Sequence, residues 1–158
     1  AASDVYKRQM ANGALAGYKM DSMKITLLDG SFHPVDSDQL SFEIAARNGY
    51  RAAAPKAGSV IMEPIMNVEV VTPEENMGDI IGDLNKRRGR VMGMTPDAEG
   101  NQVVEAEVPM AEMMSYAIDL RSMTQGRGSF TFKFVRYEEV PQMNQAKIIE
   151  DAKKDAEE

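Results

Sequence analysis

The chain of 158 residues is 43% hydrophobic and carries a formal net charge of −7, with no cysteine and one histidine. This composition predicts one or two globular cores, and no apolar run approaches the roughly 20 residues that span a bilayer, so no membrane partner is expected. The charge excludes nucleic-acid binding through the overall field but allows local basic patches, and the lack of cysteine fits a reducing cytoplasm without disulfides.

The first part of the chain predicts little regular structure before residue 20. Residues 1–9 show no clear period and are expected to form a leader without structure. Residues 20–28 alternate apolar and polar side chains, which predicts a strand that an Asp-Gly pair ends. The loop 31–36 follows and carries the only histidine, His33.

A helix is predicted after this loop. Asp36 and Gln39 have the spacing of a cap pair, and the helix is expected to continue to about Ala54. Pro55 is expected to end it, because proline lacks the backbone N–H that a helix uses. A domain boundary is predicted near Val60, after a short connector that contains glycine.

The remaining elements predict a ferredoxin-like plait. The expected order is a strand (65–71), a helix (73–88), a strand (90–94), a turn (95–101), a strand (102–108), a helix after Pro109 and a strand (129–137). This β-α-β-β-α-β order forms an antiparallel sheet with two helices on one face, so the fold class is α+β. An amphipathic helix is predicted from Pro141 onward, with Ile148 and Ile149 as its contact residues.

Both plait helices carry further signals. Thr72 and Glu75 predict a capping box at the first helix, and Gly89 is expected to be the left-handed residue that ends it. The second helix has apolar residues at helical spacing, namely Met110, Met113, Met114, Ala117 and Leu120, which predict its buried stripe.

Two groups of basic and polar residues, one at the end of each plait helix, are candidates for RNA contact. They consist of Lys86, Arg87, Arg88 and Arg90, and of Arg121, Ser122, Gln125 and Arg127. Arginine, serine and glutamine beside glycines suit contacts to phosphate and 2′-hydroxyl groups of folded RNA. The alternative is that the first group complements a helix dipole and the second is a solvated turn.

The sequence offers no motif for catalysis. Gly78 and Gly82 lack the Gly-Lys-Ser/Thr ending of a phosphate loop and are expected inside a helix. The acidic residues near them are explained by the helix dipole and by solvent exposure. His33 has no nucleophile-elbow motif to act with, so no catalytic, cofactor-binding or metal-binding residue is assigned.

Several long stretches carry a family resemblance. The chain strongly resembles the C-terminal part of bacterial elongation factor G in EPIMNVEVVTPEENMGDIIGDLNKRRGRV, AEVPMAEM, DLRSMTQGRGSF and RYEEVP, and upstream in LAGYKMDSMKITLLDGSFHPVDSDQLSF. The resemblance implies that residues 10–60 are part of the family's fourth domain, an incomplete α/β domain like domain 2 of ribosomal protein S5. It implies that residues 61–138 are the fifth domain and that residues 139–158 form a helix that packs back on the fourth.

The resemblance also implies where the ribosome is contacted. The family's fourth domain has a tip that approaches tRNA and messenger in the small-subunit decoding site, and its residues match Ser31, Phe32, His33, Pro34 and Asp36. The family's contact with the sarcin-ricin loop of large-subunit RNA matches Arg121, Ser122 and Gln125, and Arg127, Arg87 and Arg88 are further candidates to face RNA. The fifth domain is similar to the part that meets the stalk base.

The resemblance implies a monomeric, cytoplasmic fragment of a translational GTPase that promotes tRNA-mRNA translocation. GTP and magnesium would bind to the full-length parent, because the chain has no Walker A lysine and is not expected to be an enzyme itself. Pro34, Pro55 and Ala111 depart from the family pattern, which leaves a paralogue or a ribosomal protection factor as an alternative. An alternative of another class is a stand-alone ferredoxin-like domain that binds a regulatory ligand.

Overall fold

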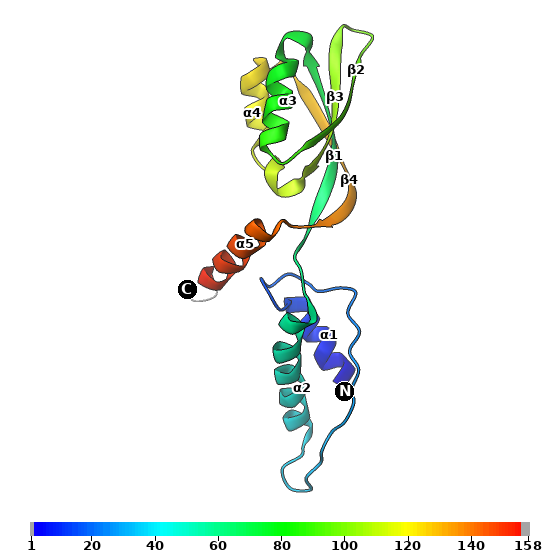
Figure 1. Cartoon of the computed structure of the whole chain (residues 1–158), viewed down its shortest axis with the longest axis vertical. Helices are drawn as coiled ribbons and strands as arrows, with labels where there is room; N and C mark the ends of the chain where they lie inside the picture. Colours follow the sequence, from blue (N-terminus) through cyan, green and yellow to red (C-terminus); the bar gives the residue numbers. More distant parts are fainter. Residues whose placement is uncertain (1, 156–158) are drawn as a thin grey trace. The chain divides into compact units, whose positions relative to one another are not determined.

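The computed structural model describes residues 2–155, which divide into two compact units (Figure 1). One unit is Met62–Glu139, and the other combines the residues before Met62 with those after Glu139. Each unit has its own buried residues, so each has a separate structural basis.

The unit Met62–Glu139 is a ferredoxin-like plait, as predicted. Its elements are β1 (Met62–Pro73), η2 (Glu74–Asn76), α3 (Met77–Lys86), β2 (Arg90–Pro96), β3 (Asn101–Pro109), η3 (Met110–Met113), α4 (Tyr116–Thr124) and β4 (Ser129–Glu139), where η marks a 3-10 helix. The strands form one sheet in the order β2-β3-β1-β4 with antiparallel neighbours. Helices α3 and α4 cover one face of this sheet (Figure 1).

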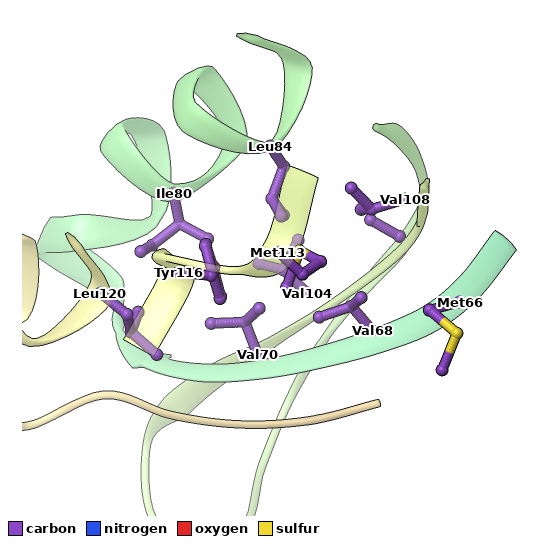
Figure 2. Packing of buried hydrophobic residues seen from close by; sticks show 11 residues of the cluster. Met66, Val68, Val70, Ile80, Leu84, Val104, Val108, Met113, Tyr116 and Leu120 are labelled. Atoms are coloured by element: carbon purple, nitrogen blue, oxygen red, sulfur yellow. The ribbon is translucent and has the colours of Figure 1, made fainter. Parts of the chain in front are cut away.

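The core of the plait lies between the two helices and the sheet face that they cover (Figure 2). Successive strand residues point to opposite faces, and Val68, Val70 and Val104 lie on the covered face without solvent exposure. Ile80 and Leu84 of α3 are fully buried against them. The apolar stripe of α3 therefore positions the end of that helix relative to the sheet.

The start of α3 differs from the prediction. Thr72 forms no capping box, because it remains in β1, where it pairs with Gln102. Its buried hydroxyl donates to the carbonyl of Pro73 at 3.5 Å. The chain then makes η2, and α3 begins only at Met77.

The end of α3 is also different. Arg88, and not Gly89, takes the left-handed conformation, with a φ of 59°. Gly89 is needed for space instead, because a Cβ atom there would lie 2.5 Å from the carbonyl oxygen of Leu84.

The second helix begins later than predicted. The residues after Pro109 form η3 before α4 starts at Tyr116. This change of helix type shifts the buried stripe, so that Met114 is exposed and Tyr116 is fully buried. The Tyr116 ring meets Phe130 of β4 edge-on, with 5.0 Å between the ring centroids, and burial raises the pKa of the Tyr116 phenol.

The other unit begins with α1 (Ala2–Asn12), which packs against α2 (Gln39–Ala53). Val5 of α1 and Tyr50 of α2 are buried. The prediction that the leader has no structure is therefore wrong for residues 2–9. Packing against α2 stabilises this short helix, whose own sequence pattern is weak.

The predicted strand at residues 20–28 is also wrong, since these residues are extended without strand pairing. A strand needs a partner for its backbone N–H and C=O groups, and the described residues of this unit form no strand at all. Apolar side chains of this segment, including Leu27 and Leu28, are exposed to solvent.

The bounds of α2 are shifted as well. Its N-cap is Asp38 and not Asp36, and the Asp38 carboxylate accepts a hydrogen bond from the Ser41 amide at 2.7 Å. Pro55 does not end the helical path, because the chain continues as η1 (Ala54–Ala57). The path ends at Gly58, with a φ of 77°.

The last element is α5 (Gln142–Asp155), in which Ile148 and Ile149 are half-buried. Its start is tied to residue 61. The amide of Val140 donates to the carbonyl of Ile61 at 2.9 Å, and the amide of Ile61 donates to the Gln145 side chain at 3.2 Å.

Candidate nucleic-acid interface

The end of α4 brings the predicted RNA-contacting residues of the plait together. Arg121, Ser122 and Gln125 are all exposed and lie within the last turn of the helix and its cap. Gln125 is left-handed with a φ of 52°, and the amides of Gln125 and Gly126 donate to the carbonyl of Arg121. The helix therefore closes on Arg121 and displays a guanidinium, a hydroxyl and an amide group.

The connection between β1 and α3 braces this turn. The Asn76 side-chain amide donates to the carbonyl of Met123 at 3.1 Å. Arg127 forms an ion pair with Glu75 at 2.5 Å, and its Nε donates to the carbonyl of Thr124 at 3.4 Å. Arg127, a predicted RNA-facing residue, is half-exposed and already has an intramolecular partner.

Arg87 does not have a free guanidinium for RNA. Its side chain is 13% exposed, and it pairs with Asp83 at 2.7 Å and with Asp119 of α4 at 2.5 Å. It also donates to the carbonyl of Glu112 at 2.6 Å and lies over the Tyr116 ring at 5.1 Å. Desolvation opposes the charge of Arg87, but the hydrogen bonds that it donates to Asp83 and Asp119 outweigh this effect and raise its pKa.

Arg88 is engaged in a second network. Its two terminal nitrogens pair with the two carboxylate oxygens of Glu63 at 2.7 and 2.8 Å, and its Nε pairs with Glu112 at 2.9 Å. These contacts, above all the one with Glu63, raise its pKa. Arg87 and Arg88 therefore fasten α3 to its neighbours, and the prediction that they face RNA is corrected.

The sheet face away from the helices carries a further ion cluster. Glu107 on β3 accepts from Arg136 on β4 at 2.7 and 2.8 Å and from Arg90 on β2 at 2.7 Å. These hydrogen bonds, chiefly those from Arg136, lower the pKa of Glu107 from 4.5 to about 2. Arg90, which belongs to the first basic group, thus also has an internal partner.

We expect this cluster to make the stability of the plait depend on acid pH. Because the folded pKa of Glu107 lies below its unfolded value, its contribution is complete above about pH 4.5 and is lost as the pH falls towards about 2. Urea unfolding across this range should show a smaller loss of stability in Glu107→Gln than in the parent chain. The same change at exposed Glu105 is the control, and equal slopes in all three proteins would contradict the prediction.

The predicted tip residues lie in the other unit, on the loop before α2. Ser31, Phe32, His33, Pro34 and Asp36 are all exposed. The His33 amide donates to the Ser37 hydroxyl at 2.7 Å, and the Ser37 amide donates to the His33 carbonyl at 3.0 Å. These bonds close a tight turn in which Nδ1 of His33 lies 3.3 Å from a carboxylate oxygen of Asp36.

The Asp38 cap fixes the end of this turn. The Ser41 hydroxyl donates to the Asp38 carboxylate at 2.6 Å and lies 3.0 Å from the carbonyl of Asp36. The hydrogen bonds from Ser41 lower the pKa of Asp38, so the cap is charged at neutral pH. The loop is thus an exposed turn seated on a capped helix.

Other kinds of site find little support. No group of His, Cys, Asp and Glu side chains suited to a metal ion occurs within residues 2–155. None of the helices in the described part of the chain is long and apolar enough to cross a bilayer. An open groove of about 320 Å³ runs along α2 beside residues 23–26, and Lys24 is the one charged residue that lines it.

Comparisons with known proteins agree with this architecture. Residues 60–148 match the family described as elongation factor G C-terminus, and residues 3–58 match elongation factor G, domain IV. The chain is similar to an elongation factor G of Amoebophilus asiaticus (strain 5a2), with 57% identity over 91% of the chain, and spans 20% of the length of that relative.

A solved structure is similar over both units. A crystal structure of a protein from Thermus thermophilus is 36% identical, has a TM-score of 0.76, and matches 97% of this chain and 23% of its own. These findings define the chain as a translation elongation factor module. Within that class it belongs to the elongation factor G family. The domain IV match begins at residue 3, so it includes most of the stretch expected to be an unmatched leader.

Sequence reasoning missed the residues that hold the candidate interface in place. Asn76, Glu75 and Asp38 make the bracing and capping contacts described above. Asp38 could have been found, because it stands three residues before Ser41 at the usual capping distance. The contacts of Asn76 and Glu75 join residues far apart in the chain and leave no local signal.

Proposed function

We propose that the chain is the ribosome-binding, C-terminal module of a translational GTPase that promotes tRNA-mRNA translocation. The single observation that carries the proposal is the braced end of α4, which displays Arg121, Ser122 and Gln125 in a chain of the elongation factor G family. The proposed partner of this surface is the sarcin-ricin loop of large-subunit RNA. The parent protein would bind GTP and magnesium in a separate domain.

The chemistry of the α4 end suits folded RNA. The net charge of −7 disfavours binding through the overall field, so contact must be local. Arg121 is an exposed cation at a helix end where the dipole is negative, and it offsets that dipole towards a phosphate group. Ser122 and Gln125 add a hydroxyl and an amide that can bond to 2′-hydroxyl groups and base edges.

The tip loop suits a different contact. Its aromatic Phe32 and imidazole His33 are exposed on a short turn that projects from the capped start of α2. Exposed rings of this kind stack on unpaired bases, and an imidazole also hydrogen-bonds to them. We therefore assign the contact with tRNA and messenger in the decoding site to this loop.

Replacing Arg121 with alanine is the direct test at the α4 end. We expect binding to ribosomes to weaken about tenfold and the salt dependence of binding to fall by about one counterion, because one phosphate contact is lost. Binding can be measured by co-sedimentation at several salt concentrations. Lys133→Ala removes an exposed charge from β4 as the control. Salt-independent binding, or equal affinity of both variants, would contradict the proposal.

Replacing His33 with alanine tests the tip loop in a full-length parent. We expect translocation to slow about tenfold, the effect of losing one good hydrogen bond or stacking contact, while GTP hydrolysis stays nearly unchanged. Rapid kinetics of messenger movement and of phosphate release would separate the two steps. Arg47→Ala, on the exposed side of α2, is the control. A parallel loss of both activities would refute the assignment of the tip.

A further inference from the structure

Thr124 ends α4 as a buried polar residue with 0% exposure. Its hydroxyl donates to the carbonyl of Leu120 at 2.8 Å and accepts from the amide of Gly128 at 2.9 Å. One side chain therefore joins the last turn of the helix to the first residues before β4. Because the Thr124 side chain is buried, no solvent molecule can easily replace these bonds.

Gly128 fits this arrangement because it has no side chain. A Cβ atom at this position would lie 2.8 Å from the Thr124 methyl carbon and 2.9 Å from its hydroxyl oxygen. The backbone of residue 128 thus rests directly on the Thr124 side chain. The hydroxyl closes the segment between the two residues into a small ring.

The closed segment contains a backbone conformation that needs support. Gln125 has a φ of 52°, which residues other than glycine rarely adopt, and Gly126 follows with a φ of 82°. The Gly126 amide also donates to the carbonyl of Arg121 at 2.9 Å. Arg121 and Gln125 are therefore both tied to the ring that Thr124 closes, Arg121 through its carbonyl and Gln125 through its backbone angles.

We propose that Thr124 is a positioning residue, whose buried hydroxyl holds Arg121 and Gln125 in the arrangement that binds RNA. This inference rests on the function proposed above for the α4 end. Without the hydroxyl, the Gly128 amide loses its acceptor and Gln125 is free to leave the left-handed conformation. The exposed groups then have to be ordered when RNA binds, which weakens binding without removing any RNA contact.

A purely structural role for Thr124 makes a different prediction. In that case the loss of the hydroxyl lowers the stability of the plait, but molecules that remain folded bind RNA as before. The two roles are therefore separated by measuring affinity under conditions in which every variant is folded. Amide NMR spectra of the full chain establish that condition and also report the exchange rate of the Gly128 amide.

The test compares Thr124→Val, which keeps the shape, with Thr124→Ser, which keeps the hydroxyl. The probes are an RNA hairpin that carries the sarcin-ricin loop sequence and intact large ribosomal subunits. We expect Thr124→Val to bind about tenfold more weakly than the parent and to exchange the Gly128 amide faster, while Thr124→Ser stays within about twofold. If the valine variant does not fold, Thr124→Ala replaces it, since it adds no volume.

A combined variant shows whether Thr124 acts through the exposed residues. In the Arg121→Ala background, we expect Thr124→Val to cost clearly less than its tenfold effect in the parent, because the two changes disturb one unit. Unchanged affinity of folded Thr124→Val, with Arg121→Ala still weakened, would overturn this inference alone. Unchanged affinity of Arg121→Ala would overturn the proposed function, and this inference with it.

Discussion

Replacing Arg88 with methionine is expected to lower the free energy of unfolding of the plait by about 3 kcal/mol. The Glu63 carboxylate is only 10% exposed and accepts from both terminal nitrogens of Arg88. Methionine keeps most of the side-chain volume but leaves this carboxylate without its cation. Urea unfolding, followed through amide signals of β1, would measure the loss.

Two further variants separate the causes of this loss. Arg88→Gly also removes the ion pairs, but it relieves the left-handed backbone at a φ of 59°, so it should be about 1 kcal/mol less destabilising than Arg88→Met. Adding Glu63→Gln to Arg88→Met should recover part of the stability, because the unpaired charge is gone. If Arg88→Met alone stays within about 0.5 kcal/mol of the parent, the pair with Glu63 contributes little.

Replacing Leu84 with alanine is expected to cost about 3 kcal/mol, within the usual range for a buried leucine. Leu84 has no exposed surface and packs with Val104 and Val108 between α3 and the sheet (Figure 2). The loss combines the transfer of the side chain with the cavity left behind, because the sheet cannot move in to fill it. The same unfolding experiment measures the effect.

The matched control is Ile118→Ala on α4, which removes a similar side chain from an exposed position. Its expected effect lies within about 0.5 kcal/mol. Equal losses for the two variants would mean that α4, and not α3, carries the main contact with the sheet, against the packing described above.

The plait could be predicted because its signals are local. The alternation in β1 and β4 and the stripe of α3 each specify one face of one element. The strand at residues 20–28 has the same kind of signal and still fails, because a strand needs a partner as well as a pattern. Thr72 fails as a cap for a related reason, since the sheet extends to this residue and uses its backbone.

The candidate site was predictable in its residue types but not in its construction. Arg121 and Gln125 are exposed, as their place after a helix suggests. Arg87 looks equivalent in the sequence, yet its guanidinium is taken by Asp119, which lies 32 residues further along. The approach of Gly128 to Thr124 likewise depends on a turn conformation that no periodicity reports.

The pairing of Met62 with Glu139 has a mechanical consequence. The chain enters and leaves the plait through neighbouring antiparallel strands, so tension between residues 61 and 140 would act at one end of the β1–β4 ladder. Such a load opens the hydrogen-bonded pairs in succession, which resists far less than shearing the whole strand. Glu63 stands on the second rung of this ladder, so its bidentate clamp to Arg88 is one of the first contacts to bear the force.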